Sequence, residues 1–211
     1  RQRQMCIRDS SFDVVSTGMI LSAEQAALVS DFCEQSAKKG ALVFVDPIMG
    51  DEGKLYNGVG EETIAHMRKM VAVADCIVPN YTEAAYLADM PYHEDMTEEE
   101  ARALTIRLHE MGAKSVVVTS AKVDGENCVV GYDGTEGEFF RIPFDLIPVR
   151  FVGTGDIFAA VMLGRLVDGV PLQESTHRAM DAVRTMIDRN RDKEDKYLGI
   201  PIETCLEVLD E

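Results

Sequence analysis

The chain has 211 residues, enough for one domain of ordinary size with a buried core. Its 37 acidic and 21 basic side chains give a formal net charge of -16, and so acidic a surface repels nucleic acid and anionic membranes. No apolar run approaches the roughly 20 residues of a membrane-spanning helix, and the first residues lack the apolar stretch of a signal peptide. The five cysteines are scattered without a C-x-x-C pair, which predicts reduced thiols and a cytoplasmic protein.

The pattern of apolar residues predicts alternating strands and helices. Residues 1–10, rich in arginine and glutamine, differ from the rest, so we expect a tail there and one domain over residues 11–211. Apolar runs predict strands at 12–16, 42–45, 76–78 and 115–118. Capping residues and helical periods predict helices over 22–39, 63–74, 82–88 (capped by Thr82) and 97–112. Asp133-Gly134 predicts a hairpin between strands 127–132 and 138–142, followed by helices that end at 166, 190 and 209.

Strands that alternate with helices predict an α/β fold with a mainly parallel sheet and helices on both faces. In such folds, ligands bind at the carboxyl ends of the strands. Polar residues follow four predicted strands at this point, after Val45, Val78, Val118 and Val152. The four strand ends together predict a binding site.

The segment Gly153-Thr154-Gly155-Asp156 stands where a helix is expected to begin. Glycines allow a sharp turn, and the free amides of a helix N-terminus bind anions such as a phosphoryl group in transfer. Asp156 could accept a proton from an attacking hydroxyl. An ordinary helix cap explains the same residues, so the segment by itself leaves both interpretations open. It matches neither the dinucleotide fingerprint nor the P-loop.

Three other strand ends carry polar groups. Asn80 and Glu83 lie three apart at a helix start, where an amide and a carboxylate could hold hydrated Mg²⁺; helix capping is the alternative. Asp46 follows the strand at 42–45 and could face a Mg²⁺–phosphate complex, although Asp-Pro is also a common turn. Thr119 and Ser120 offer hydroxyls to phosphates, with an ordinary polar turn as the alternative.

Together these segments resemble the ribokinase-like superfamily, and within it the pyridoxal kinases of vitamin B6 salvage. The resemblance runs from about Phe12 to the C-terminus. It rests on four segments in the family's order, namely VDPIMGD at 45–51, VPNYTEA at 78–84, VVTS at 117–120 and FVGTGDIFAA at 151–160.

The resemblance implies ATP-dependent phosphorylation of the 5′-hydroxymethyl group of pyridoxal, pyridoxamine or pyridoxine by a homodimer that uses Mg²⁺. It leaves the requirement for a monovalent cation as an open question. It implies that Asp156 is the base and that Gly153, Thr154 and Gly155 form the anion hole. It also implies that Mg²⁺ is organised, largely through water, by Asp46, Asn80 and Glu83. The residues that would contact the ATP phosphates are Asp46, Asn80, Thr119 and Ser120. Met19 would lie on the vitamin side, and residues 127–142 and 144–151 would flank the nucleotide base.

Two related families of kinases differ from this chain at the site. Hydroxymethylpyrimidine kinases usually carry Cys in place of Asp156, and sugar kinases of the superfamily carry Ala in place of Thr154. The chain also departs from the B6 kinases, because the family's first strands are missing and Met19 stands where many relatives have an aromatic residue. A hydroxymethylpyrimidine kinase and a non-catalytic ATP-binding fragment therefore remain alternatives.

Overall fold

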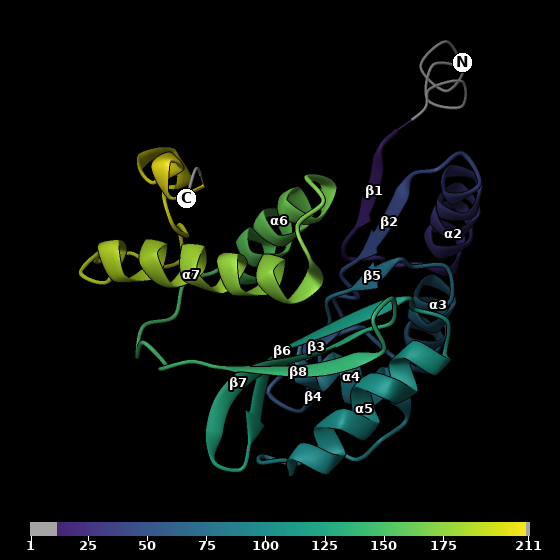
Figure 1. Ribbon diagram of the computed structural model, residues 1–211, viewed down its shortest axis with the longest axis horizontal. Helices are drawn as coiled ribbons and strands as arrows, with labels where there is room; N and C mark the ends of the chain where they lie inside the picture. The colour runs from purple at the N-terminus through teal and green to yellow at the C-terminus, as the bar shows by residue number, and fades with distance from the viewer. Residues whose placement is uncertain (1–11, 210–211) are drawn as a thin grey trace.

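A six-stranded sheet forms the centre of the computed structural model, which describes residues 12–209 (Figure 1). The predicted tail at 1–10 lies outside the described residues. The strand order is β1-β2-β5-β6-β7-β8. The strands are β1 (Val14–Thr17), β2 (Leu42–Val45), β5 (Cys76–Ile77), β6 (Ser115–Val123), β7 (Glu126–Asp133) and β8 (Glu138–Pro143).

The first four strands of the sheet run parallel, and the last two continue it as antiparallel hairpins. β1, β2, β5 and β6 therefore end at the same edge, as predicted for a mainly parallel sheet. A separate two-stranded hairpin, β3 (Gly50–Asp51) and β4 (Lys54–Leu55), was not predicted. It turns through Glu52 and Gly53, which both have positive φ.

Helices cover both faces of the sheet, as predicted (Figure 1). Strand residues alternate between two cores: Val43 and Val45 lie in the core beneath the first four helices, and Phe44 lies in the core beneath the last two. No helix within residues 12–209 is long and apolar enough to span a bilayer. The helices are α2 (Ala23–Ala37), α3 (Glu61–Val71), α4 (Tyr81–Ala88), α5 (Glu98–Glu110), α6 (Thr154–Val167) and α7 (Leu172–Asn190).

Predictions of two element types or lengths were wrong. The expected helix at 202–209 is instead two short 3-10 segments, Ile202–Thr204 and Leu206–Leu209. β6 extends past 118 to Val123 and forms a further hairpin through Asp124 and Gly125, both with positive φ, a turn that the Asp-Gly pair signals. The hairpin between β7 and β8 forms as predicted, although its turn is longer than two residues.

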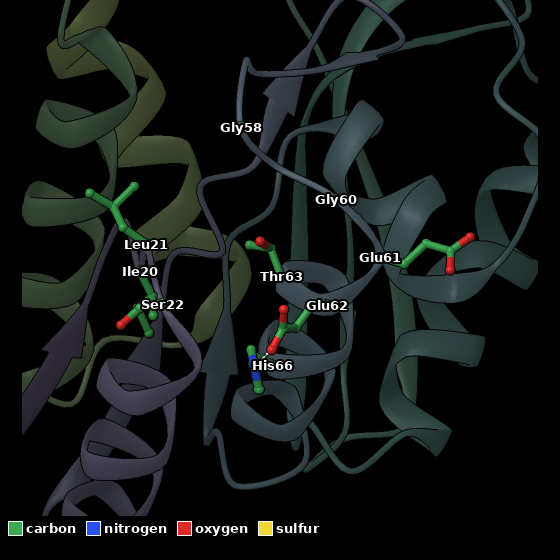
Figure 2. A pocket seen from close by; sticks show the side chains of 9 residues that line it. All are labelled: Ile20, Leu21, Ser22, Gly58, Gly60, Glu61, Glu62, Thr63 and His66. Carbon is green, nitrogen blue, oxygen red and sulfur yellow. Dashed lines mark ion pairs between the residues drawn. The ribbon is translucent and has the colours of Figure 1, made fainter.

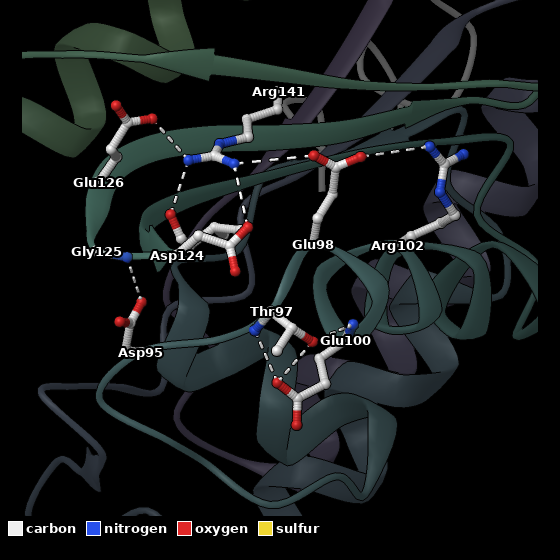
Figure 3. Close-up of polar contacts among 10 residues, drawn as sticks. Asp95, Thr97, Glu98, Glu100, Arg102, Asp124, Gly125, Glu126 and Arg141 are labelled. Atoms are coloured by element: carbon white, nitrogen blue, oxygen red, sulfur yellow. Dashed lines mark hydrogen bonds and ion pairs between the residues drawn. The ribbon is translucent and has the colours of Figure 1, made fainter.

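A cluster of charged residues joins these hairpins to the start of α5 (Figure 3). Arg141 of β8 contacts Glu126 at 2.8 Å, Asp124 at 3.5 Å and Glu98 at 3.8 Å. The predicted capping box at the start of α5 is present beside it, between Thr97 and Glu100. These contacts fix the antiparallel end of the sheet against the helical layer.

Candidate functional site

Polar residues follow the parallel strands at one edge of the sheet, where the sequence predicted them. Asp46 follows β2, and its backbone N–H donates to Thr17 at the end of β1. Asn80 follows β5 and is bridged to Thr119 of β6. Met19 follows β1 and is exposed. The structure therefore brings these strand ends into one row, and the end of β1, which leads to Met19, is at the outer end of that row.

The turn before α6 supplies the amides that the sequence predicted. Gly153 has φ +83°, a left-handed conformation that favours glycine, and it caps a helix that begins at Thr154. The first amides of an α-helix have no intrahelical partner, so this turn offers N–H groups to an anion. Asp156 lies exposed in the first turn of the same helix. Its carboxylate is therefore open to solvent beside the free amides.

Asp46, at the end of β2, lies near Asp156, at the start of α6. Burial, and after it the negative charge of Asp156, together raise the pKa of Asp46 to about 7. An aspartate whose pKa is raised in this way sits in an environment that lacks positive charge. Such environments are typical of functional sites.

Asn80 and Glu83 form a capping box at the start of α4. Glu83 Oε2 accepts from the Asn80 backbone N–H at 2.9 Å, and the Asn80 side chain accepts from the Glu83 N–H at 3.0 Å. Asn80 is therefore the cap, and the prediction that Thr82 caps this helix was wrong, because Thr82 Oγ1 instead accepts from the Gly53 N–H at 2.8 Å.

The same two side chains hold the loop after β2. Glu83 Oε1 accepts from the N–H of Met49 at 2.9 Å and of Gly50 at 3.4 Å, and Asn80 Nδ2 donates to the Gly50 carbonyl at 2.8 Å. Burial raises the pKa of Glu83, these backbone donors lower it and the charge of Asp46 raises it; the net result is a pKa of about 7. Glu83 therefore connects the helix start, the loop after β2 and Asp46.

Thr119 and Ser120 sit in a β-bulge of β6. The register with β7 shifts between Val118 and Ala121, and Ser120 has φ +55°. Bulges redirect side chains and are frequent beside active sites. Here the bulge leaves Thr119 half-buried and Ser120 exposed, next to Asn80. Both hydroxyls thus lie at the same edge as the carboxylates.

The β3–β4 hairpin adds residues that the sequence analysis did not assign. Asp51 and Glu52 of this hairpin pair with Arg150, which precedes the Gly153 turn. Tyr56 lies close by, and its pKa is raised by burial and then by the nearby charges of Asp51 and Glu83. Glu52-Gly53 is not among the dipeptides that mark tight hairpin turns, so the sequence carried no strong local signal for this hairpin.

The carboxylates provide a test of whether Mg²⁺ suits this site. Within residues 12–209, no three His, Cys, Asp or Glu side chains converge as a metal cluster. Asp46 and Glu83 nevertheless repel each other and are poorly solvated, as their raised pKa values show. A cation held mainly through water, as Mg²⁺ usually is, would relieve both effects. The donor set therefore fits hydrated Mg²⁺.

A separate cavity of about 270 Å³ opens between the starts of α2 and α3 (Figure 2). None of the predicted site residues lines it. His66 projects from α3 beside Glu62, with 3.7 Å between Nε2 and Oε1. The cavity walls are Ile20, Leu21, Ser22, Gly58, Gly60, Glu61, Glu62, Thr63 and His66.

The chain is similar to known proteins in sequence and in fold. A family model described as phosphomethylpyrimidine kinase matches residues 1–199. Pyridoxal kinase of Arabidopsis thaliana is 32% identical over 171 residues, which are 77% of this chain and 53% of that protein. The chain spans about half the length of the curated relatives it matches.

Solved structures of related kinases are also similar to this chain. A candidate phosphomethylpyrimidine kinase from Bacteroides thetaiotaomicron, crystallised with pyridoxal, is 31% identical with a TM-score of 0.91, over 100% of this chain and 75% of that one. Pyridoxal kinase from Lactobacillus plantarum is 27% identical with a TM-score of 0.84, over 99% and 74%. These likenesses confirm the ribokinase-like fold and the resemblance to pyridoxal kinases. The chain belongs to the phosphomethylpyrimidine kinase family.

Proposed function

We propose that the protein transfers the terminal phosphoryl group of ATP to the 5′-hydroxymethyl group of pyridoxal, pyridoxamine or pyridoxine. One observation supports this most directly: Asp156 lies in the first turn of α6, beside the free amides of the Gly153 turn. A base and an anion-binding turn on the same few residues are what phosphoryl transfer to a hydroxyl requires. The names of the matched relatives, pyridoxal kinases, support the choice of substrate.

In this proposal, Asp156 accepts the proton of the vitamer hydroxyl as its oxygen forms the new bond to phosphorus. The bond from phosphorus to the ADP oxygen breaks, and ADP leaves. The amides of Gly153, Thr154 and Gly155 donate to the oxygens of the transferred group, where negative charge is spread in the transition state. Positioning and charge neutralisation therefore provide most of the catalysis.

The other predicted site residues serve the nucleotide. Asp46 and Glu83, with Asn80, would hold Mg²⁺ through water, and the ion would neutralise phosphate charge. Thr119 and Ser120 would donate to ATP phosphates, and residues 127–142 and 144–151 would flank the base. Met19, at the end of the row, would lie on the vitamer side. A monovalent cation and a homodimer remain predictions from the resemblance, and a cytoplasmic location remains a prediction from the scattered cysteines.

A hydroxymethylpyrimidine kinase is the second candidate, because the matching family model carries the name phosphomethylpyrimidine kinase. The pyridoxal bound in the Bacteroides structure favours the B6 vitamers. Competition between pyridoxal and hydroxymethylpyrimidine for phosphorylation would separate the two. The non-catalytic alternative, an ATP-binding fragment, predicts nucleotide binding without turnover.

The variant Asp156→Asn tests the proposal. It removes the base while keeping the side-chain size, so we expect turnover to fall by at least about 100-fold, the usual contribution of a general base. The dissociation constant of the nucleotide, measured by calorimetry, should stay within about twofold of the wild-type value. Asp168→Asn is the matched control, because Asp168 caps the opposite end of α6 and is exposed. Turnover of the Asp156 variant at the control rate would remove Asp156 from the role of base.

A further inference from the structure

The segment between β8 and α6 leads directly into the Gly153 turn and has no regular secondary structure. Phe151 anchors one point of it, because this side chain is buried in a small core with Ile157 and Met186. Arg150, the preceding residue, instead projects to the surface, with 73% of its side chain exposed. The position of the turn therefore depends on how this irregular segment is held.

Arg150 reaches the β3–β4 hairpin with both ends of its guanidinium. Its Nη1 donates to Glu52 Oε1 at 2.6 Å, and its Nη2 donates to Asp51 Oδ2 at 2.7 Å. The two partners of the second bond are 99 residues apart in sequence. A planar guanidinium that engages two carboxylates fixes direction as well as distance, which a single ion pair does not.

The hairpin that receives Arg150 is itself fixed to the metal side of the site. The Gly50 backbone is held by Glu83 and by Asn80, and the Gly53 N–H donates to Thr82. A Cβ at Gly50 would lie 2.4 Å from the Lys54 carbonyl oxygen, so the hairpin closes tightly at this point. The hairpin is therefore a firm support for Arg150.

We propose that Arg150 is a positioning residue that fastens the Gly153 turn to the β3–β4 hairpin and so sets the distance between the anion-binding amides and the carboxylates of Asp46 and Glu83. The link also offsets one of the two negative charges of Asp51 and Glu52, at a site that must accept a polyanion. This inference rests on the proposed function, since the distance matters only if a phosphoryl group is transferred there.

Hydrogen exchange tests the link without any need for activity. In the 211-residue chain carrying Arg150→Ala, we expect the amide of Ile157, which donates to the Gly153 carbonyl at 3.1 Å, to exchange about fivefold faster, about 1 kcal/mol at 1.4 kcal/mol per tenfold. Arg150→Lys, which can keep one of the two ion pairs, should recover part of the protection. Arg178→Ala is the matched control, because Arg178 is paired with Glu174 on α7, away from the turn. Unchanged exchange in Arg150→Ala would overturn the proposal.

Kinetics then distinguish positioning from direct contact with the nucleotide. A positioning role predicts that Arg150→Ala lowers kcat about fivefold while KM for Mg·ATP changes less than about twofold. A raised KM with unchanged kcat would mean that Arg150 touches the nucleotide itself, and it would overturn the positioning role. If the wild-type chain shows no turnover with any vitamer, the proposed function fails, whereas the exchange result still decides whether Arg150 holds the turn.

Discussion

Replacing Asp46 by Asn should stabilise the fold, and the gain should depend on pH. The substitution keeps the size of the side chain and removes a charge that burial and Asp156 both disfavour. The pKa of Asp46 rises from 3.8 to about 7 on folding. At about 1.4 kcal/mol per pKa unit, the ionised carboxylate costs the native state about 4 kcal/mol.

The sign follows from the order in which the two states lose the proton. Near the unfolded pKa, 3.8, the native side chain is still neutral and the cost is small. As pH rises toward about 7, the unfolded chain is ionised while the native chain keeps its proton, so native stability falls. Above that pH both states are ionised and the full cost is present. The advantage of Asp46→Asn should therefore grow with pH and then become constant.

Urea unfolding followed by circular dichroism measures this directly. Between about pH 5 and about pH 8, the free energy of unfolding of Asp46→Asn minus that of the wild type should increase by about 3 kcal/mol. Asp145→Asn is the control, since this exposed aspartate lies on the loop after β8 and its removal changes the net charge equally. A difference that does not change with pH would refute the claim that Asp46 is crowded by burial and by Asp156.

Three other outcomes are expected. Glu83→Gln should raise the Mg²⁺ concentration for half-maximal turnover by about tenfold, whereas Glu62→Gln, at an exposed position on α3, should leave it unchanged. The same Mg²⁺ requirement in both variants would remove Glu83 from the metal site. Mg·nucleotide binding measured by calorimetry should strengthen from about pH 6 to about pH 8, because the carboxyl groups of Asp46 and Glu83, whose pKa values are raised to about 7, must ionise to hold the cation; a flat profile would contradict this. Gly131→Ala should lower the free energy of unfolding in urea by about 1–3 kcal/mol, because the new Cβ would lie 2.2 Å from Phe140 Cζ. The Cβ of Gly164→Ala would meet nothing within 4 Å, so this variant should be as stable as the wild type or more stable. Equal effects of the two substitutions would contradict the packing around Gly131.

The parallel strands and their polar ends could be predicted from sequence. β2 and the start of β6 are uninterrupted apolar runs, as expected of strands covered on both faces. Once those strands are parallel, Asp46, Asn80 and Thr119 must lie at one edge, and the structure places them there. This part of the site depends on local pattern and on one rule of topology.

The rest of the site depends on tertiary contacts that carry no local pattern. The strands of the β3–β4 hairpin have two residues each, too short for any period to be visible. The pairing of Arg150 with Asp51 joins residues 99 apart, which neither residue signals alone. The cap of α4 was assigned to Thr82 because Thr and Asn are both good caps, although the spacing of Asn80 and Glu83 is that of a capping box.

The proposal that this chain phosphorylates a B6 vitamer is tested most directly by ADP release. The 211-residue chain is incubated with Mg·ATP and, in parallel, with pyridoxal, pyridoxamine or hydroxymethylpyrimidine, with ATP binding measured on the same sample. We predict ADP release that requires pyridoxal or pyridoxamine and is lost in Asp156→Asn. Release with hydroxymethylpyrimidine alone, or no release from a folded chain that binds ATP, would contradict the account.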